Sequence, residues 1–128
     1  MTLGMAEIDH FKRVNDEFLH ATGCAVLREL ACLVTGHLRE IDLVGRYGGE
    51  EFALAFPETD VANVARLADR LRELVARHDW TRVALGLSVT LSIGLAEHAG
   101  TASLEEQFGV ADAKLYEAKT NGRNRVSF

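Results

Sequence analysis

Apolar positions along the chain repeat with two periods, one typical of strands and one typical of helices. Residues 2–8 are mostly apolar and are followed by Asp9, which predicts a short central strand with acidic residues at its C-terminal end. Between residues 15 and 39 the apolar side chains recur every three or four positions. This spacing predicts a long amphipathic helix in which Gly23 marks a candidate break.

The middle of the chain predicts a hairpin followed by a second helix. Residues 43–47 and 52–56 are apolar or alternating runs on either side of two adjacent glycines, and they are the expected arms of the hairpin. Pro57 ends the second arm. Thr59 or Asp60 is the expected N-cap of the helix, because an apolar stripe at helical spacing follows directly.

The C-terminal part predicts a strand region, a third helix and an edge strand. Residues 82–96 are rich in β-forming side chains, alternate between apolar and small polar types toward their end, and contain Gly86 as a turn or bulge. Ser103 and the glutamate three residues later have the spacing of a capping box that opens a helix. Gly122 is expected to end this helix, and residues 125–128 follow as the edge strand.

The order of these elements is strand, helix, strand, strand, helix, strand, helix, strand, without an internal repeat, linker or low-complexity segment. Alternating elements around a central hairpin are typical of a ferredoxin-like α+β sandwich, in which helices cover one face of a mostly antiparallel sheet. A chain of 128 residues is long enough for one domain with a sizeable core.

The hairpin turn carries two glycines, Gly48 and Gly49, and two carboxylates, Glu50 and Glu51. Adjacent like charges repel and glycines weaken strand pairing, so hairpin stability does not account for this choice. Carboxylate oxygens are preferred ligands of Mg²⁺, and glycines that reach positive φ let a nucleotide approach the backbone. The turn is therefore a candidate metal and phosphate site, with a solvated surface turn as the alternative.

Topology is expected to gather further carboxylates at this turn. A strand, helix, strand crossover makes the first two strands parallel, so the end of the first strand and the hairpin turn lie at the same edge of the sheet. Glu7, Asp9, Glu50 and Glu51 should converge there, and without a cation they would repel one another. The same reasoning places residues 39–42 at the opposite edge.

Composition narrows the classes of partner. The formal net charge of −5 at pH 7 argues against a broadly basic surface, so no DNA or RNA partner is expected. No apolar run approaches the roughly 18 residues that a membrane span requires. The N-terminus also lacks the features of a signal peptide, so we expect a cytoplasmic domain without membrane contact. Cys24 and Cys32 do not have metal-ligand spacing and are expected to be reduced, structural thiols.

Five motifs, in order along the chain, resemble those of the GGDEF domain of diguanylate cyclases. They are I-D-H-F-K-R-V-N-D at 8–16, R-x-x-D at 39–42, R-Y-G-G-E-E-F at 46–52, V-T-L-S-I-G at 89–94 and A-D-A-K-L-Y-E-A-K-T-N-G-R-N at 111–124. The resemblance implies the cyclase-palm form of the α+β sandwich, with a mostly antiparallel sheet flanked by helices. It also implies that residues 1–128 are a single GGDEF domain that lacks the family's N-terminal helix and any regulatory domain.

The resemblance implies a reaction in which two GTP molecules condense to cyclic di-GMP and two pyrophosphates. Each domain of the family holds one GTP, so a homodimer is needed for catalysis, and cyclic di-GMP can bridge two domains. By resemblance the cofactor is Mg²⁺ or Mn²⁺. The metal ligands are the Glu7 side chain, the Ile8 carbonyl and Glu50, with Glu51 near the attacking hydroxyl as a second ligand or base.

Positions that hold GTP in the family have counterparts across the chain. The matching residues are His10, Phe11, Lys12, Asn15, Cys24, Gly48, Gly49, Lys119 and Arg123. Taken alone, the last two are typical solvated charges at a helix C-terminus, and Asn15 is a typical helix cap.

Residues Arg39 and Asp42 match the family's inhibitory site, which binds the product, and Arg70 matches an arginine that joins a second domain to the bound dinucleotide. An arginine fork suits a phosphate or the Hoogsteen edge of guanine, and a carboxylate suits the guanine N–H edge. A local salt bridge at the helix end is the alternative interpretation of this R-x-x-D.

Three positions depart from the family pattern. Glu7 replaces an aspartate, which adds a methylene to a ligand of an ion with strict geometry. Leu19 replaces a glycine, whose small size and access to positive φ suit a crowded base pocket. Cys24 replaces an aspartate that can accept two guanine N–H bonds.

These departures leave several functions open. One is a diguanylate cyclase of low activity with product feedback. A second is a catalytically impaired receptor that binds cyclic di-GMP through the R-x-x-D residues. A third is a relaxed cyclase that also accepts ATP, and a fourth is a pure dimerisation module.

Overall fold

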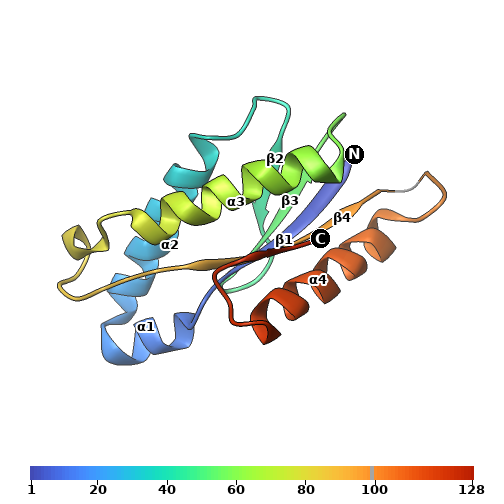
Figure 1. Ribbon diagram of the computed structural model, residues 1–128. Coiled ribbons are helices and arrows are strands. Elements are labelled where there is room, and N and C mark those ends of the chain that lie inside the picture. Colours follow the sequence, from blue (N-terminus) through green and yellow to red (C-terminus); the bar gives the residue numbers. More distant parts are fainter. Residues whose placement is uncertain (99) are drawn as a thin grey trace.

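The computed structural model describes residues 1–98 and 100–128, which form a five-stranded sheet with helices on both faces (Figure 1). The strand order is β2-β3-β1-β4-β5, and every neighbouring pair is antiparallel except β4 and β5. The strands are β1 (Thr2–Ile8), β2 (Leu43–Arg46), β3 (Glu51–Phe56), β4 (Leu91–Glu97) and β5 (Val126–Ser127). The helices are α1 (Phe11–Glu17), α2 (His20–Thr35), α3 (Val61–Arg77) and α4 (Leu104–Thr120), with a 3₁₀ turn at Trp80–Arg82.

The α+β sandwich expected from the sequence is confirmed, but the helices do not share one face. Alternate residues of β1 and β4 point to opposite sides, and both sides are buried. Ala6, Ile8, Leu91 and Ile93 belong to the larger core, which α1, α2 and α3 complete. The smaller core on the other side joins β1 and β4 to α4 alone, through Met5, Ala96, Ala111 and Leu115.

Close packing of α4 depends on Gly94 in β4. A Cβ atom at this position would lie 2.1 Å from the backbone nitrogen of Leu115 and 2.3 Å from the carbonyl oxygen of Ala111. The helix therefore rests directly on the strand backbone, and this contact sets the position of the last turn of α4 relative to the end of β1.

The helix expected over residues 15–39 is wrong in its bounds, because the structure has two helices there, α1 and α2. The break lies at Phe18 and Leu19, whose extended backbones separate the helices. Gly23 lies inside α2, where a Cβ would come within 2.1 Å of the Asn15 side-chain oxygen. This glycine therefore allows α1 and α2 to pack closely and does not end a helix.

The strand region expected over residues 82–96 is also too long. Only Leu91–Glu97 forms β4, and it is preceded by the 3₁₀ turn and an irregular segment in which Gly86 has a φ of +80°. The turn predicted at Gly86 is thus confirmed. Apolar side chains of this irregular segment, Leu87 and Val89, are buried in the core, which explains their strand-like pattern.

Other expected boundaries agree within one residue. The hairpin arms are β2 and β3, and the last edge strand is β5. Asp60 caps α3 by accepting a bond from the Asn63 amide, and Ser103 caps α4 by accepting one from the Glu106 amide. Both cysteines are free and exposed, so neither is a structural thiol of the core.

We expect Gly94→Ala to destabilise the domain by about 1–3 kcal/mol, because the added methyl group must displace the backbone of α4. Gly109→Ala is the matched control, since it lies within α4 and its Cβ would meet no atom within 4 Å. That change should instead stabilise the domain by about 0.5–1 kcal/mol, the usual gain for alanine in a helix. Urea unfolding followed by circular dichroism measures both; equal stability of the two variants would contradict the packing described.

Candidate active site

The turn between β2 and β3 is held by main-chain bonds and by one arginine. Tyr47 and Gly48 donate backbone bonds of 2.8 and 3.3 Å to the Glu51 carbonyl. The Arg46 guanidinium donates bonds of 3.1 Å to the Gly48 carbonyl and 2.8 Å to the Gly49 carbonyl. Arg46 therefore fixes the shape of the turn from one side.

The two glycines of this turn leave its backbone uncovered. Neither has positive φ, so the expected left-handed conformation is wrong. A Cβ at Gly49 would meet nothing within 4 Å, and one at Gly48 would meet only the Glu51 Cβ at 3.9 Å. The absence of side chains gives a ligand direct access to the main chain.

Carboxylates and a lysine converge beside the turn. Glu7 at the end of β1 pairs in register with Glu51 at the start of β3. Lys119, in the last turn of α4, places its Nζ 3.1 Å from both carboxylate oxygens of Glu7. The Ile8 amide donates a 3.2 Å bond to the Glu50 carbonyl, which ties the turn to β1. Glu7, Glu50 and Glu51 therefore lie at the same edge of the sheet, as predicted.

Glu50, just before β3, and Glu51, the first residue of β3, line cavities on opposite sides of the sheet. Glu51 lines a cavity of about 350 Å³ on the α4 side, together with Asp112. Glu50 lines a cavity of about 470 Å³ on the side of α1 and α2. Glu7 thus has Glu51 as its cross-strand partner, whereas Glu50 faces the second cavity.

Negative charge accumulates around Glu51. Partial burial raises the pKa of this carboxyl, and the nearby charges of Glu7, Asp112 and Glu50 raise it further, while Lys119 opposes them. The donor set consists of hard oxygens, which suits Mg²⁺ or Mn²⁺. In residues 1–98 and 100–128 no three metal-binding side chains are already arranged around one point. A cation here would therefore need main-chain or substrate oxygens as well.

Asp9 is not part of this acidic group, contrary to the expected convergence of four carboxylates. It is buried, and its Oδ1 accepts a 2.6 Å bond from the Ser92 hydroxyl. Its Oδ2 accepts bonds of 2.6 Å from the Thr90 hydroxyl and 3.0 Å from the Asn124 amide. Asp9 therefore anchors the segment after α4 to the end of β1.

The cavity on the side of α1 and α2 gathers most of the residues predicted to hold a nucleotide. The residues that line it are Phe11, Lys12, Asn15, His20, Cys24, Leu27, Arg46, Gly49 and Glu50. Gly48, His10, Lys119 and Arg123 do not line it. His10 has a φ of 54° at the start of α1, and Arg123 has a φ of 62° after α4.

Four residues of this site were not predicted: Gly23, His20, Leu27 and Arg46. Gly23 lies against the Asn15 side chain, and any larger residue would push that amide out of place. Glycine in a helix interior lowers the stability of the helix, so its presence at position 23 was the sequence signal that could have pointed to a close contact there. Leu19 was expected to crowd the pocket, but its φ is −88°, its side chain is 75% exposed and it does not line the cavity.

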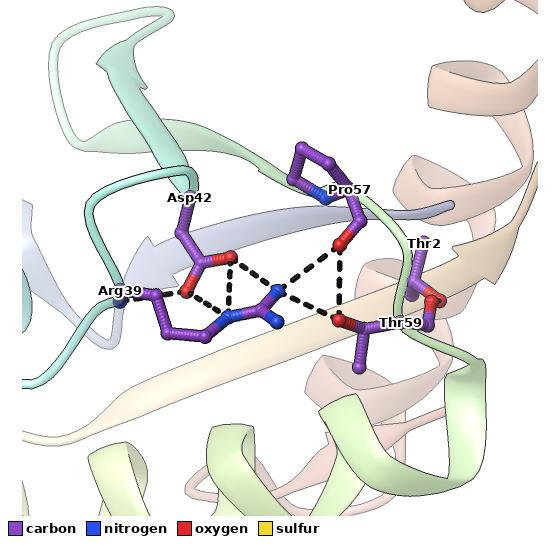
Figure 2. A network of polar contacts seen from close by, with 5 residues as sticks. All are labelled: Thr2, Arg39, Asp42, Pro57 and Thr59. Carbon is purple, nitrogen blue, oxygen red and sulfur yellow. Dashed lines mark hydrogen bonds and ion pairs between the residues drawn. The ribbon is translucent and has the colours of Figure 1, made fainter.

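Residues Arg39 and Asp42 lie at the opposite end of the sheet, as predicted, and are bonded to each other (Figure 2). The Arg39 Nη2 lies 2.7 Å from Oδ1 of Asp42, 3.1 Å from the Pro57 carbonyl and 2.6 Å from the Thr59 hydroxyl. The Thr2 hydroxyl donates a 2.8 Å bond to the Thr59 carbonyl. The local salt bridge is therefore the arrangement present, and no bond joins Arg70 to this pair among the described residues.

Asp42 is a buried partner of this ion pair. Its side chain is 0% exposed, against 48% for Arg39. Burial alone would raise the pKa of Asp42, but hydrogen bonds from Arg39 and its positive charge outweigh burial and hold the pKa below its usual value. The pair thus links the end of α2 to the start of α3 through charge-assisted bonds.

A family profile described as "Diguanylate cyclase, GGDEF domain" matches residues 1–125. The chain belongs to the GGDEF domain family. It is 44% identical over 126 residues to the response regulator PleD of Caulobacter vibrioides. This alignment covers 95% of the chain and 28% of PleD. It is 41% identical over 126 residues to the diguanylate cyclase DgcM of Escherichia coli K12, covering 98% of this chain and 30% of DgcM. The chain therefore spans less than a third of the length of these relatives.

Solved GGDEF structures share the fold. The GGDEF domain of DgcB from Caulobacter crescentus in complex with c-di-GMP matches with a TM-score of 0.90 and 36% identity, over 98% of this chain and 75% of that one. The active GGEEF domain of a diguanylate cyclase from Vibrio cholerae matches with a TM-score of 0.90 and 33% identity, over 98% of this chain and 80% of that one.

None of the helices in residues 1–98 and 100–128 is both long and apolar enough to cross a membrane.

We expect Asp42→Asn to lower the free energy of unfolding by about 1.5–3 kcal/mol at pH 7, because it removes a buried charge that several Arg39 bonds satisfy. The folded-state pKa of Asp42 is lowered, so its contribution is complete above the unfolded pKa of about 3.9 and is lost as the pH falls through the folded value. Urea unfolding at pH 7 and pH 3 should show a smaller difference between wild type and variant at pH 3 than at pH 7. An equal difference at both values would contradict this assignment.

Proposed function

We propose that this GGDEF domain is a diguanylate cyclase, which condenses two GTP molecules to cyclic di-GMP with release of two pyrophosphates. The observation that carries the proposal is the cavity beside the bare glycine turn, which holds Lys12, Asn15 and Glu50 and lies next to the pair formed by Glu7 and Glu51. The family match and the cyclases among the relatives support the same reaction.

The cavity residues account for nucleotide binding. The Asn15 amide, held by Gly23, meets a base edge, and the uncovered main chain at Gly48 and Gly49 admits the ribose and the α-phosphate. The first-turn amides of α1, at His10 and Phe11, have no intrahelical acceptors. With the positive charges of Lys12, Lys119 and Arg123, they bind the triphosphate.

Glu7, Glu50 and the Ile8 carbonyl, together with Glu51, would hold a Mg²⁺ or Mn²⁺ ion. Such an ion supplies positive charge to the phosphates and favours deprotonation of the attacking hydroxyl. The Lys119 ammonium balances the Glu7 charge in this structure. Once another cation balances that charge, the ammonium is free to bind a phosphate. Because one domain holds one GTP, two domains face each other as a homodimer for the reaction. The R-x-x-D pair with Arg70 would bind the product as feedback.

Glu50→Gln should reduce cyclic di-GMP formation from GTP at least about 100-fold, since it removes a charge from the ion and substrate site. Binding of cyclic di-GMP, measured by calorimetry, should persist, because Arg39 lies at the other end of the sheet. Arg39→Ala should instead weaken binding of cyclic di-GMP and leave its formation from GTP unchanged. Glu97→Gln, at the exposed end of β4, is the matched control and should change neither property. Loss of the same property in both variants would contradict the placement of two separate sites.

A receptor that binds cyclic di-GMP without synthesis is the second candidate. The intact Arg39 and Asp42 pair and the thiol of Cys24 in the cavity favour it. Dinucleotide binding without any product from GTP, even after forced dimerisation, would support the receptor and exclude the cyclase.

Cys24 also predicts relaxed choice between purines. A thiol is a weak acceptor, whereas a carboxylate accepts two guanine N–H bonds, so the wild type should use GTP and ATP within about tenfold of each other. Cys24→Asp should raise the preference for GTP by about 10- to 100-fold. Cys32→Asp is the control, because Cys32 is exposed on the same helix but does not line the cavity. Strong GTP preference in the wild type would exclude this relaxation.

A further inference from the structure

A third cavity, of about 360 Å³, opens between α2 and the sheet over β2 and β3. It reaches the core, because its floor includes Leu30, Leu54, Leu91 and Ile93, which are only 1–3% exposed. Nothing in the proposed reaction uses this space, although it lies on the same side of the sheet as the nucleotide cavity.

Small residues explain why the cavity stays open. Ala31 of α2, Ala6 of β1 and Gly45 of β2 line it where larger side chains would close it. The walls are almost entirely apolar, so water that enters this open space finds few hydrogen-bond partners there. An apolar ligand of matching size would gain free energy by covering these apolar walls and displacing that water.

Positive charge lies in the lining of this otherwise apolar cavity. Arg28 and Arg46 both line it. Arg28 is exposed and belongs to none of the ion pairs formed within residues 1–98 and 100–128. The neighbouring carboxylate of the helix, Glu29, is instead bonded to His78 at 2.8 Å. A carboxylate on a ligand would therefore find a guanidinium without a competing partner.

We propose that this cavity binds an amphipathic anion, with an apolar chain inside and a carboxylate at Arg28 and Arg46. The apolar body is recognised by the core side chains of the floor, and the charge selects an anion over a cation or a neutral molecule.

Occupancy of this cavity affects the nucleotide cavity, because Leu27 and Arg46 line both. The Arg46 guanidinium donates to the carbonyls of Gly48 and Gly49. A carboxylate that draws this guanidinium toward itself weakens those bonds and loosens the glycine turn. The anion and the nucleotide therefore weaken each other's binding by the same factor, a step that rests on the proposed function.

Calorimetric titration of decanoate into the chain, below the concentration at which decanoate forms micelles, tests the site without any nucleotide. We expect saturable binding at one site and at least about fivefold weaker binding of decyltrimethylammonium. Ala31→Phe should abolish binding by filling the cavity, and the exposed position of Ala31 on α2 makes this change compatible with folding. Unchanged decanoate binding in Ala31→Phe, with a native circular dichroism spectrum, would overturn the proposal.

Arg28→Glu should weaken decanoate binding about fivefold or more and reduce the preference over the cation. Arg66→Glu, an exposed charge reversal on α3 away from the cavity, is the matched control. Equal weakening in both variants would show a general charge effect and overturn the assignment of the carboxylate to Arg28.

The coupling is measured separately, by titrating a non-hydrolysable GTP analogue with and without saturating decanoate. We expect several-fold weaker nucleotide binding with decanoate, and no change in Ala31→Phe. Decanoate binding in a chain that binds no nucleotide would refute the proposed function alone, whereas independent binding of the two ligands would refute the coupling through Arg46.

Discussion

The register of β1 between β3 and β4 is the constraint on which the site depends. β1 is buried on both faces, so a shift by one residue would exchange its two sets of side chains between the two cores. The register that results places Glu7 opposite Glu51 and Ser92. Because α4 rests on the bare backbone of Gly94, its last turn is brought to the same place, and Lys119 reaches Glu7. The charged group beside the turn follows from apolar packing on both sides of one strand.

Two acidic residues at the end of β1 have different environments and therefore different roles. Asp9 accepts three hydrogen bonds from Thr90, Ser92 and the Asn124 amide, which leaves it little capacity for a cation. Glu7 is instead paired with the Lys119 ammonium at 3.1 Å, a partner that another cation could replace. A buried carboxylate with fixed neutral donors stabilises the fold, whereas one paired with a partly exposed lysine remains available to a ligand.

Much of the fold was predictable because local signals were consistent with it. Paired glycines, the Asp60 and Ser103 caps and regular apolar spacing located the hairpin, α3 and α4. The opposite orientation of Glu50 and Glu51 was also predictable from the sequence, because side chains alternate along β3 and the alternation can be continued back through Glu51 to Glu50. A glycine inside a helix marked Gly23 as unusual, but its role was not predictable, because it depends on how closely α1 and α2 pack. Nor could the anchoring of Asp9 be foreseen, since its donors lie more than 80 positions away along the chain.

The two ends of the sheet are connected by β1 itself. A dinucleotide at the R-x-x-D pair would have to take the Arg39 guanidinium from the Pro57 carbonyl and the Thr59 hydroxyl, and the lost bonds reduce its net affinity. Thr59 is also bonded to the buried Thr2 at the start of β1, and Glu7 lies near the other end of that strand. β1 is packed on both faces and joins Thr2 to Glu7 through a continuous backbone. The bonds around Thr59 therefore connect the Arg39 and Asp42 pair, through β1, to the strand end that carries Glu7.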